Sequence, residues 1–190
     1  MICYNIFMDK DSNKEVRCSF IGHRFIENSE LISSLLKDKI VALIEQEGVN
    51  TFLFGSRSAF DDLCHSVVTE LREVYPFINR VAYTCRSEAA TMEYEREDDE
   101  RAFSKLMGKE IHLKGFESEV EFAKKYEAGR ASYIERNQAM IDDSNYCIFY
   151  YNDSYSPRGA VRSGTRIAYD YAKRVEKRKQ SQLVVINIFP

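Results

Sequence analysis

The feature that most constrains the fold is an alternation of two hydrophobic patterns along the chain. Short runs that are apolar at nearly every position alternate with segments whose apolar residues recur at helical spacing. Such strands are typical of a parallel sheet that helices cover on both faces. We therefore expect an α/β fold, a Rossmann-like, doubly wound, mostly parallel sheet in three αβα layers. The expected strands are 16–22, 51–55, 80–85, 146–151 and 182–189.

Capping residues set the expected boundaries of the first two helices. Asn28 or Ser29 can cap a helix that Gly48 closes. Ser58 can cap a second helix, whose apolar face continues to Val74. Both helices follow an expected strand, as an alternating α/β fold requires.

Residues 86–129 interrupt this alternation. Residues 86–101 carry seven acidic side chains against three arginines, which predicts a solvated excursion or an exposed helix. The pattern returns where SYIE (132–135) forms a capping box that starts a helix, and another helix follows Thr165. We expect a single domain, 1–190, with a variable acidic excursion around 86–129.

Composition excludes several classes of partner. A net charge of −3 argues against a broad basic surface, so neither nucleic acid nor a membrane is an expected partner. No apolar run approaches the roughly 20 residues of a spanning helix, and the N-terminus lacks a signal-peptide pattern. Five scattered cysteines without a CxxC pair predict free thiols in a cytoplasmic protein, with no disulfide framework and no metal site. No cofactor is expected.

Three loops at the expected carboxyl ends of strands carry an arginine beside a glycine. They are GHR (22–24), GSRS (55–58) and RSGT (162–165). A glycine permits close backbone approach, a helix N-terminus favours an anion, and arginine offers a forked donor to phosphate. Any one loop could be a plain turn or cap, but three at one sheet edge predict a shared phosphate site. Phe60 and Asp61, from the helix that follows the second loop, are added to the loop residues. The candidates are Gly22, His23, Arg24, Gly55, Ser56, Arg57, Phe60, Asp61, Ser163, Gly164 and Thr165.

A fourth candidate lies on the helix expected after residue 132. Tyr133, Arg136, Asn137 and Met140 fall on one helical face. Arg136 and Asn137 either point into the ligand crevice or form a solvated flank with internal ion pairs.

The remaining aromatic and histidine residues leave alternatives open. His23 is more typical of a hydrogen-bonded loop histidine than of a catalytic base, and His65 is expected on the exposed side of its helix. Tyr150, Tyr151 and Tyr155 could stack on a base or pack in the core.

The chain contains four motifs in this order: SFIGHR, FLFGSRSAFD, ERNQAMIDDSNYCIFYYN and SGT. Together they resemble the SLOG superfamily, particularly its YpsA-like branch. The resemblance covers most of the chain and implies a Rossmann-like domain that binds nucleotides or nucleotide-derived ligands. One branch, the LOG-type phosphoribohydrolases, cleaves the N-glycosidic bond of nucleoside monophosphates. Other members look like sensors of NAD-derived or cyclic-nucleotide signals in bacterial and phage conflict systems.

The LOG pattern transfers only in part. Glu135, Arg136, Met140 and Ser144 match its Glu-Arg pair, methionine and serine, so the resemblance makes Arg136 a catalytic or phosphate-site candidate. The LOG phosphate loop continues to a glutamate, and this sequence has Ala168 there.

Loss of that carboxylate puts hydrolysis in doubt, because a carboxylate near the developing oxocarbenium ion assists glycosidic cleavage. Glu135 and Asp61 are possible substitutes. Asp170 lies two residues beyond Ala168, about 200° around the helix, and could substitute only if the helix were placed differently. The expected function is therefore a sensor or sequestering protein for a nucleotide-derived ligand, acting as a homo-oligomer. The alternatives are a LOG-like N-glycosidase and an interaction module that recruits a partner through the acidic segment.

Overall fold

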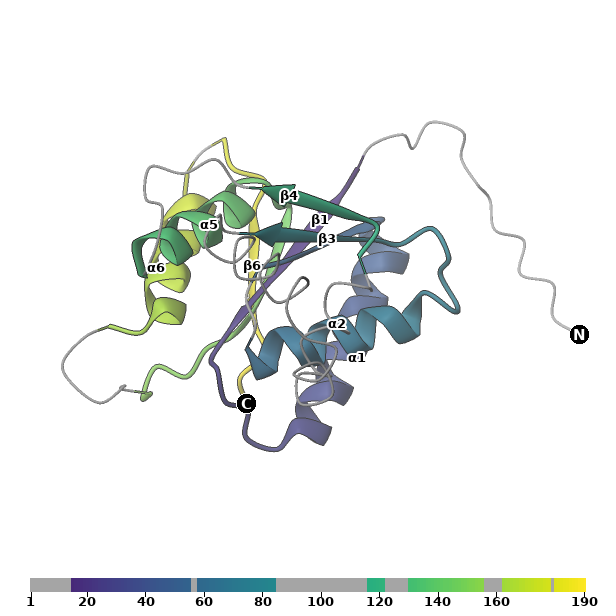
Figure 1. Ribbon diagram of the computed structural model, residues 1–190, viewed down its shortest axis with the longest axis horizontal. Coiled ribbons are helices and arrows are strands. Elements are labelled where there is room, and N and C mark those ends of the chain that lie inside the picture. Colours follow the sequence, from purple (N-terminus) through teal and green to yellow (C-terminus); the bar gives the residue numbers. More distant parts are fainter. Residues whose placement is uncertain (1–14, 56–57, 85–115, 122–129, 156–161, 179) are drawn as a thin grey trace, which may run out of the picture.

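Six parallel strands form one sheet in the order β4-β3-β2-β1-β5-β6 (Figure 1). The computed structural model describes residues 15–55, 58–84, 116–121, 130–155, 162–178 and 180–190. The strands are β1 (Arg17–Gly22), β2 (Thr51–Phe54), β3 (Asn79–Thr84), β4 (Ser118–Glu121), β5 (Tyr146–Tyr150) and β6 (Val184–Asn187).

Helices cover both faces of this sheet. Within the described residues they are α1 (Ser29–Glu47), α2 (Ala59–Leu71), α5 (Arg130–Asp142) and α6 (Gly164–Glu176). Helices α1 and α2 pack against each other, and α5 packs against α6 on the opposite side of the sheet (Figure 1). The expected three-layer, doubly wound α/β architecture is confirmed.

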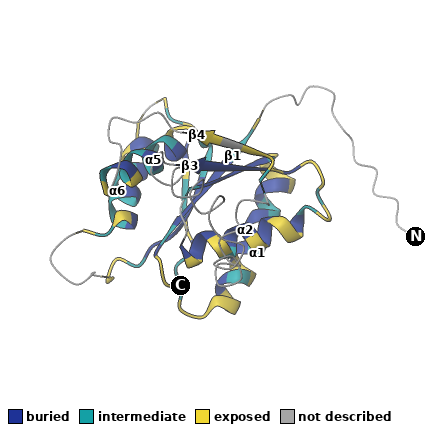
Figure 2. Cartoon of the chain, in the orientation of Figure 1, coloured by how far each residue is buried: buried dark blue, intermediate teal, exposed yellow. Residues whose placement is uncertain are grey.

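The central strands β1, β2, β3 and β5 are buried on both faces, as their unbroken apolar runs predicted, whereas the edge strands β4 and β6 are more exposed (Figure 2). Toward α1 and α2, the rings of Phe20 and Phe52 stack with centroids 5.8 Å apart, and Phe54 lies 5.2 Å from Phe20. Toward α5 and α6, Cys147 and Phe149 belong to a second apolar cluster. Alternate residues of each central strand therefore enter different cores.

The predicted caps of the first two helices are confirmed. Asn28 takes the left-handed conformation, with φ of 52°, and its Oδ1 accepts a hydrogen bond from the Leu31 amide. Gly48 ends α1 with φ of 70°, a conformation that side chains disfavour. Ser58 caps α2.

Two boundaries differ from the prediction. Helix α2 ends at Leu71, so Val74 leaves the apolar face and is 68% exposed. Helix α5 already contains Arg130, so Ser132 is not its cap but a buried residue inside the helix. A capping box is a local pattern, and packing of α5 against the sheet overrides it here.

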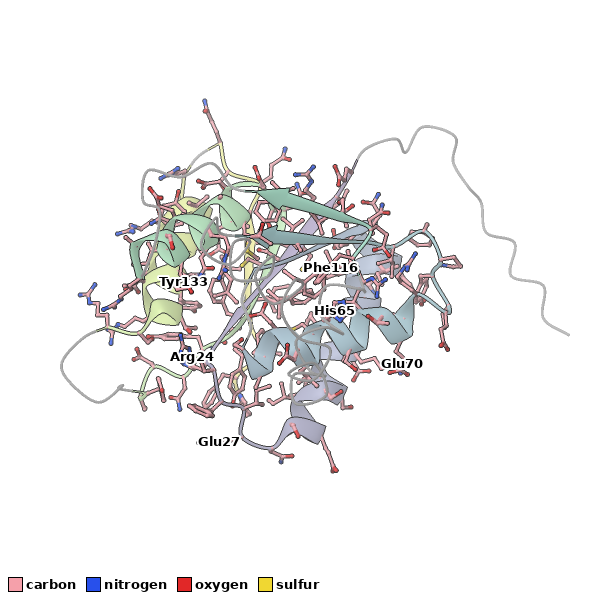
Figure 3. The ribbon with its side chains drawn as sticks, viewed as in Figure 1. Arg24, Glu27, His65, Glu70, Phe116 and Tyr133 are labelled. Carbon is pink, nitrogen blue, oxygen red and sulfur yellow. The ribbon has the colours of Figure 1, made fainter. Side chains whose placement is uncertain are left out.

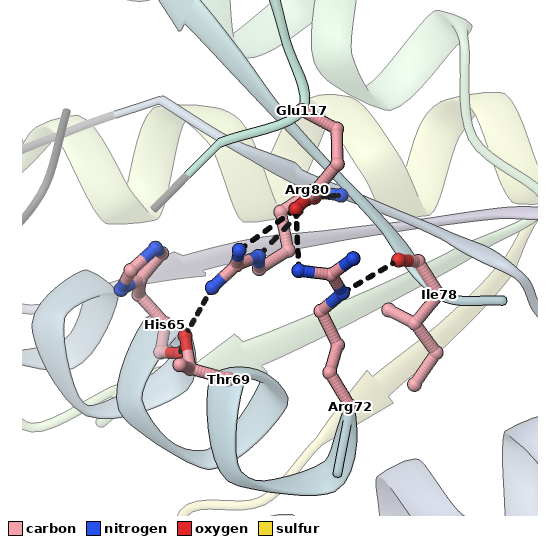
Figure 4. A network of polar contacts seen from close by, with 6 residues as sticks. All are labelled: His65, Thr69, Arg72, Ile78, Arg80 and Glu117. Carbon is pink, nitrogen blue, oxygen red and sulfur yellow. Dashed lines mark hydrogen bonds and ion pairs between the residues drawn. The ribbon is translucent and has the colours of Figure 1, made fainter. Parts of the chain in front are cut away.

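Strand β4 was not predicted, and a polar network fastens it at the amino ends of the strands (Figure 4). The Arg80 guanidinium donates to both oxygens of Glu117, at 2.8 and 3.2 Å, and to Thr69 Oγ1 at 2.7 Å. Arg72 forms an ion pair of 2.7 Å with Glu117 and donates to the carbonyl of Ile78. The network joins α2, β3 and the residue before β4.

The rest of the acidic excursion, residues 85–115 and 122–129, lies outside the described residues. Cys18, Cys64 and Cys147 are free and buried, and burial raises the pKa of the Cys147 thiol to about 12. Within the described ranges, no helix has the length and apolar character needed to cross a membrane.

Candidate functional site

The strand order places a topological switch point between β1 and β5. From β1 the chain adds strands outward on one side through β2, β3 and β4, and then returns to place β5 on the other side. In doubly wound sheets, ligands bind beyond the carboxyl ends of the strands at such a point. The residues that follow β1 and β5 therefore define the candidate site.

Helix α6 begins at this switch point. Ser163 caps the helix, and its Oγ accepts a hydrogen bond of 3.1 Å from the Arg166 amide. Thr165 Oγ1 donates a hydrogen bond of 2.9 Å to the carbonyl of Gly22, the last residue of β1. The free amides and positive dipole end of α6 consequently lie at the carboxyl end of β1.

Gly22 also permits helix α2 to approach β1. A Cβ atom on Gly22 would lie 2.3 Å from Cδ1 and 2.7 Å from Cβ of Phe60, which no side chain tolerates. The Ala59 amide donates to the carbonyl of Arg24 at 3.3 Å. The N-terminus of α2 is thus held against the segment that follows β1.

The first turn of α2 is closed by its own side chains. Ser58 Oγ accepts a hydrogen bond from the Asp61 amide and donates one of 2.9 Å to Asp61 Oδ2. Both residues are buried, and the carboxylate at the positive end of the helix favours the helical turn. Asp61 therefore lies beneath the surface as part of the cap.

Helix α5 makes a second close approach, at the end of β2. A Cβ atom on Gly55 would lie 2.2 Å from Sδ of Met140 and 2.9 Å from Nε of Arg136. Arg136 is only 1% exposed. Its Nη2 donates to Asn137 Oδ1 at 3.3 Å, and its guanidinium lies over the ring of Tyr133, 5.3 Å from the centroid. The predicted common face of these α5 residues is confirmed.

His23 is a hydrogen-bonded residue at the switch point. Its amide donates to the carbonyl of Tyr150, and its Nε2 accepts a hydrogen bond of 3.0 Å from the Asn152 amide. Burial lowers the pKa of His23, although the Asn152 contact acts in the opposite direction. Tyr150 and Tyr151 are buried, whereas Tyr155 is exposed with its ring 4.5 Å from that of His23.

The expectation for His65 is wrong, because this residue is buried (Figure 3). Its ring lies 4.7 Å from that of Phe116 and 5.5 Å from that of Phe54. Phe116 lies within the segment 86–129 that interrupts the α/β pattern, so the helical periodicity of α2 could not reveal this contact.

The candidate carboxylates are separated from one another. Ala168, at the position of the LOG glutamate, is buried in the cluster that contains Ile21 and Phe149. Asp170 is partly exposed and forms an ion pair of 3.7 Å with Arg162. Glu135 is partly buried on α5.

Of the three candidate residues Arg24, Ser56 and Arg57, the structure describes only Arg24. Ser56 and Arg57 lie outside the described residues, and Arg24 is exposed on the side where β1 ends (Figure 3). No group of three or more histidine, cysteine, aspartate or glutamate residues that could hold a metal ion occurs in the described part of the chain.

Sequence reasoning missed Thr84. It ends β3 at the same edge of the sheet, and its buried Oγ1 has no hydrogen-bond partner among the residues that the structure describes. The only available signal was a polar residue at the end of the RVAYTC run.

The YpsA family model, described as the YspA SLOG family, matches residues 23–188. The chain belongs to this SLOG family. The match begins directly after Gly22 and includes every other candidate residue, so the resemblance stated from the sequence motifs is confirmed. No curated protein matches the chain significantly.

Proposed function

We propose that this SLOG-family protein binds a nucleotide or a nucleotide-derived signal, such as ADP-ribose, cyclic ADP-ribose or a cyclic nucleotide, and senses or sequesters it. The observation that carries the proposal is the hydrogen bond from Thr165 to the carbonyl of Gly22. This bond places the N-terminus of α6 at the switch point, where free amides and the helix dipole favour a phosphate.

Arginines at the same edge of the sheet supply positive charge. Arg24 is exposed after β1, and the buried guanidinium of Arg136 lies beside Gly55 after β2. A forked guanidinium suits phosphate oxygens, and the fixed position of Arg136 lowers the entropy cost of binding. These features support recognition of an anionic ligand.

Hydrolysis is the second candidate function, and the proximity of Glu135 to Arg136 on α5 favours it. Two observations weigh against it. Ala168 lies in apolar surroundings, and Asp170 is paired with Arg162, so neither position of α6 offers a free carboxylate. We therefore place binding first and N-glycosidase activity second.

A matched pair of arginine variants tests the binding proposal by calorimetry. The titrants are ADP-ribose, cyclic ADP-ribose isomers and cyclic di- and trinucleotides. Arg24→Gln should weaken binding of the best ligand about tenfold, the loss of one charge-assisted contact. Arg174→Gln removes another exposed arginine, in the last turn of α6, and should leave affinity unchanged.

Absence of binding by the folded wild-type protein to every titrant would overturn the proposal, as would equal effects of the two variants. Chromatography after incubation with nucleoside monophosphates tests the second candidate. Release of free base that is lost in Glu135→Gln would place hydrolysis first.

A further inference from the structure

Tyr133 is an exposed aromatic ring on an otherwise buried helix face. Arg136 and Met140 share that face and are almost completely buried, whereas Tyr133 is 38% exposed. The Arg136 guanidinium lies over the ring, 5.3 Å from its centroid. This contact fixes the ring by a cation–π interaction and leaves part of it open to solvent.

Helix α5 holds Tyr133 at the carboxyl edge of the sheet. One turn before it, Arg130 donates a hydrogen bond to the carbonyl of Arg162, the residue that precedes the cap of α6. One turn after it, Arg136 lies against Gly55 at the end of β2. The ring is therefore one helical turn from each of two contacts that belong to the candidate site.

We propose that Tyr133 is the platform on which the base of the nucleotide ligand stacks. This inference rests on the proposed function and adds to it a recognition element for the base. A neutral ring offers no positive charge to attract a phosphate. Its flat face can, however, stack on the planar surface of any base. A ring on a helix is also positioned more firmly than one on a loop.

Tyr155 is the competing platform, and the geometry favours it less. It is exposed, but its ring lies against His23 at the β1–β5 side of the edge. It belongs to the segment after β5 rather than to a helix. Variants of Tyr155 are thus the appropriate comparison for variants of Tyr133.

Calorimetry with AMP and ribose 5-phosphate separates the base from the phosphate. Tyr133→Leu should weaken AMP binding roughly 10- to 100-fold, the usual loss of one stacked base, and leave ribose 5-phosphate binding unchanged. Tyr133→Phe should bind both ligands as the wild type does. Tyr155→Leu should also retain wild-type affinity for AMP.

A fluorescence experiment gives a second readout that does not depend on loss of function. The chain contains no tryptophan, so Tyr133→Trp and Tyr155→Trp each introduce a single reporter. AMP should quench the reporter at position 133 and leave the one at position 155 unaffected, and ribose 5-phosphate should quench neither.

The outcomes distinguish the two proposals. If the wild type binds neither AMP, ribose 5-phosphate nor any signal molecule of the calorimetric panel, the proposed function fails and the platform with it. If AMP or another base-containing ligand binds but Tyr133→Leu loses no affinity for it, only the platform is overturned. Effects confined to Tyr155 variants likewise overturn it and move the base to the β1–β5 side.

Discussion

The two edges of the sheet gather different polar features. At the amino edge, Arg80, Arg72 and Glu117 bind one another in a network that also includes Thr69 (Figure 4). At the carboxyl edge, the Arg136 guanidinium lies against a neutral amide and an aromatic ring. The amino edge is characterised by pairs of opposite charges. The carboxyl edge is characterised by helix N-termini and by glycines that permit close approach.

This difference separates a structural edge from the edge at which we propose that the ligand binds. A network of ion pairs and hydrogen bonds stabilises the attachment of β4, and its charged groups are paired with one another. Helix N-termini brought together by Gly22 and Thr165 keep amides that an anion can use. Substitutions at the two edges should therefore differ in whether affinity changes along with stability.

The largest expected effect is on stability and comes from Glu117→Ala at the amino edge. The variant leaves the buried Arg80 guanidinium without its carboxylate, which should lower the free energy of unfolding by about 3 kcal/mol. Urea denaturation measures this loss. Ligand affinity, measured well below the unfolding transition, should stay at the wild-type value.

Glu70→Ala is the matched control. Glu70 pairs with Lys37 on the surface, where both side chains are exposed, so its loss should cost less than about 1 kcal/mol. A similar loss of stability in the two variants, or a loss of ligand affinity in Glu117→Ala, would contradict the assignment of this edge to structure alone.

A smaller loss of stability, accompanied by a loss of affinity, is expected for Gly22→Ala at the carboxyl edge. The new Cβ would overlap the ring of Phe60 and displace the start of α2, at a cost of about 2 kcal/mol. Thermal unfolding and calorimetry measure the two effects. Gly164→Ala is the control for stability, since its Cβ meets nothing within 4 Å and should not destabilise the fold.

The smallest effect is the pH dependence contributed by His23. Its pKa lies below the ordinary value of 6.5 in the folded protein because burial disfavours the charged ring. The unfolded chain binds the proton more readily, so this contribution is complete above pH 6.5 and is lost as pH falls through the lowered pKa.

His23→Gln should reduce the fall in stability on acidification from pH 7 toward pH 5, as followed by urea denaturation. Glu117 contributes only at lower pH. Partial burial acts to raise its pKa, but hydrogen bonds from Arg80 outweigh burial and hold the pKa below 4.5. An unchanged pH profile in the variant would show that His23 is not the titrating group.

Most of the fold follows from local sequence signals. Unbroken apolar runs identified five strands, and Asn28, Gly48 and Ser58 set helix boundaries through backbone chemistry that acts over a few residues. Strand β4 could not be predicted, because SEVE is a polar edge strand held by Arg80 and the preceding Glu117 from outside its own sequence.

The candidate site was predictable as a set of residues but not as a geometry. The loop patterns indicated Gly22 and Gly55 as positions of close approach, yet their neighbours, Phe60 and Met140, depend on how α2 and α5 cross the sheet. His65 shows the same limit, because its burial depends on Phe116, a distant residue in the sequence. Helical periodicity describes one element and cannot indicate a contact with another.

The hydrogen bond between Thr165 and Gly22 makes the position of one helix depend on a distant strand. It joins the start of α6 directly to the last residue of β1, 143 residues earlier in the chain. Two elements from opposite ends of the sequence are thereby held in register at the switch point. A displacement of the end of β1, such as a side chain at position 22 would cause, should therefore also move the start of α6.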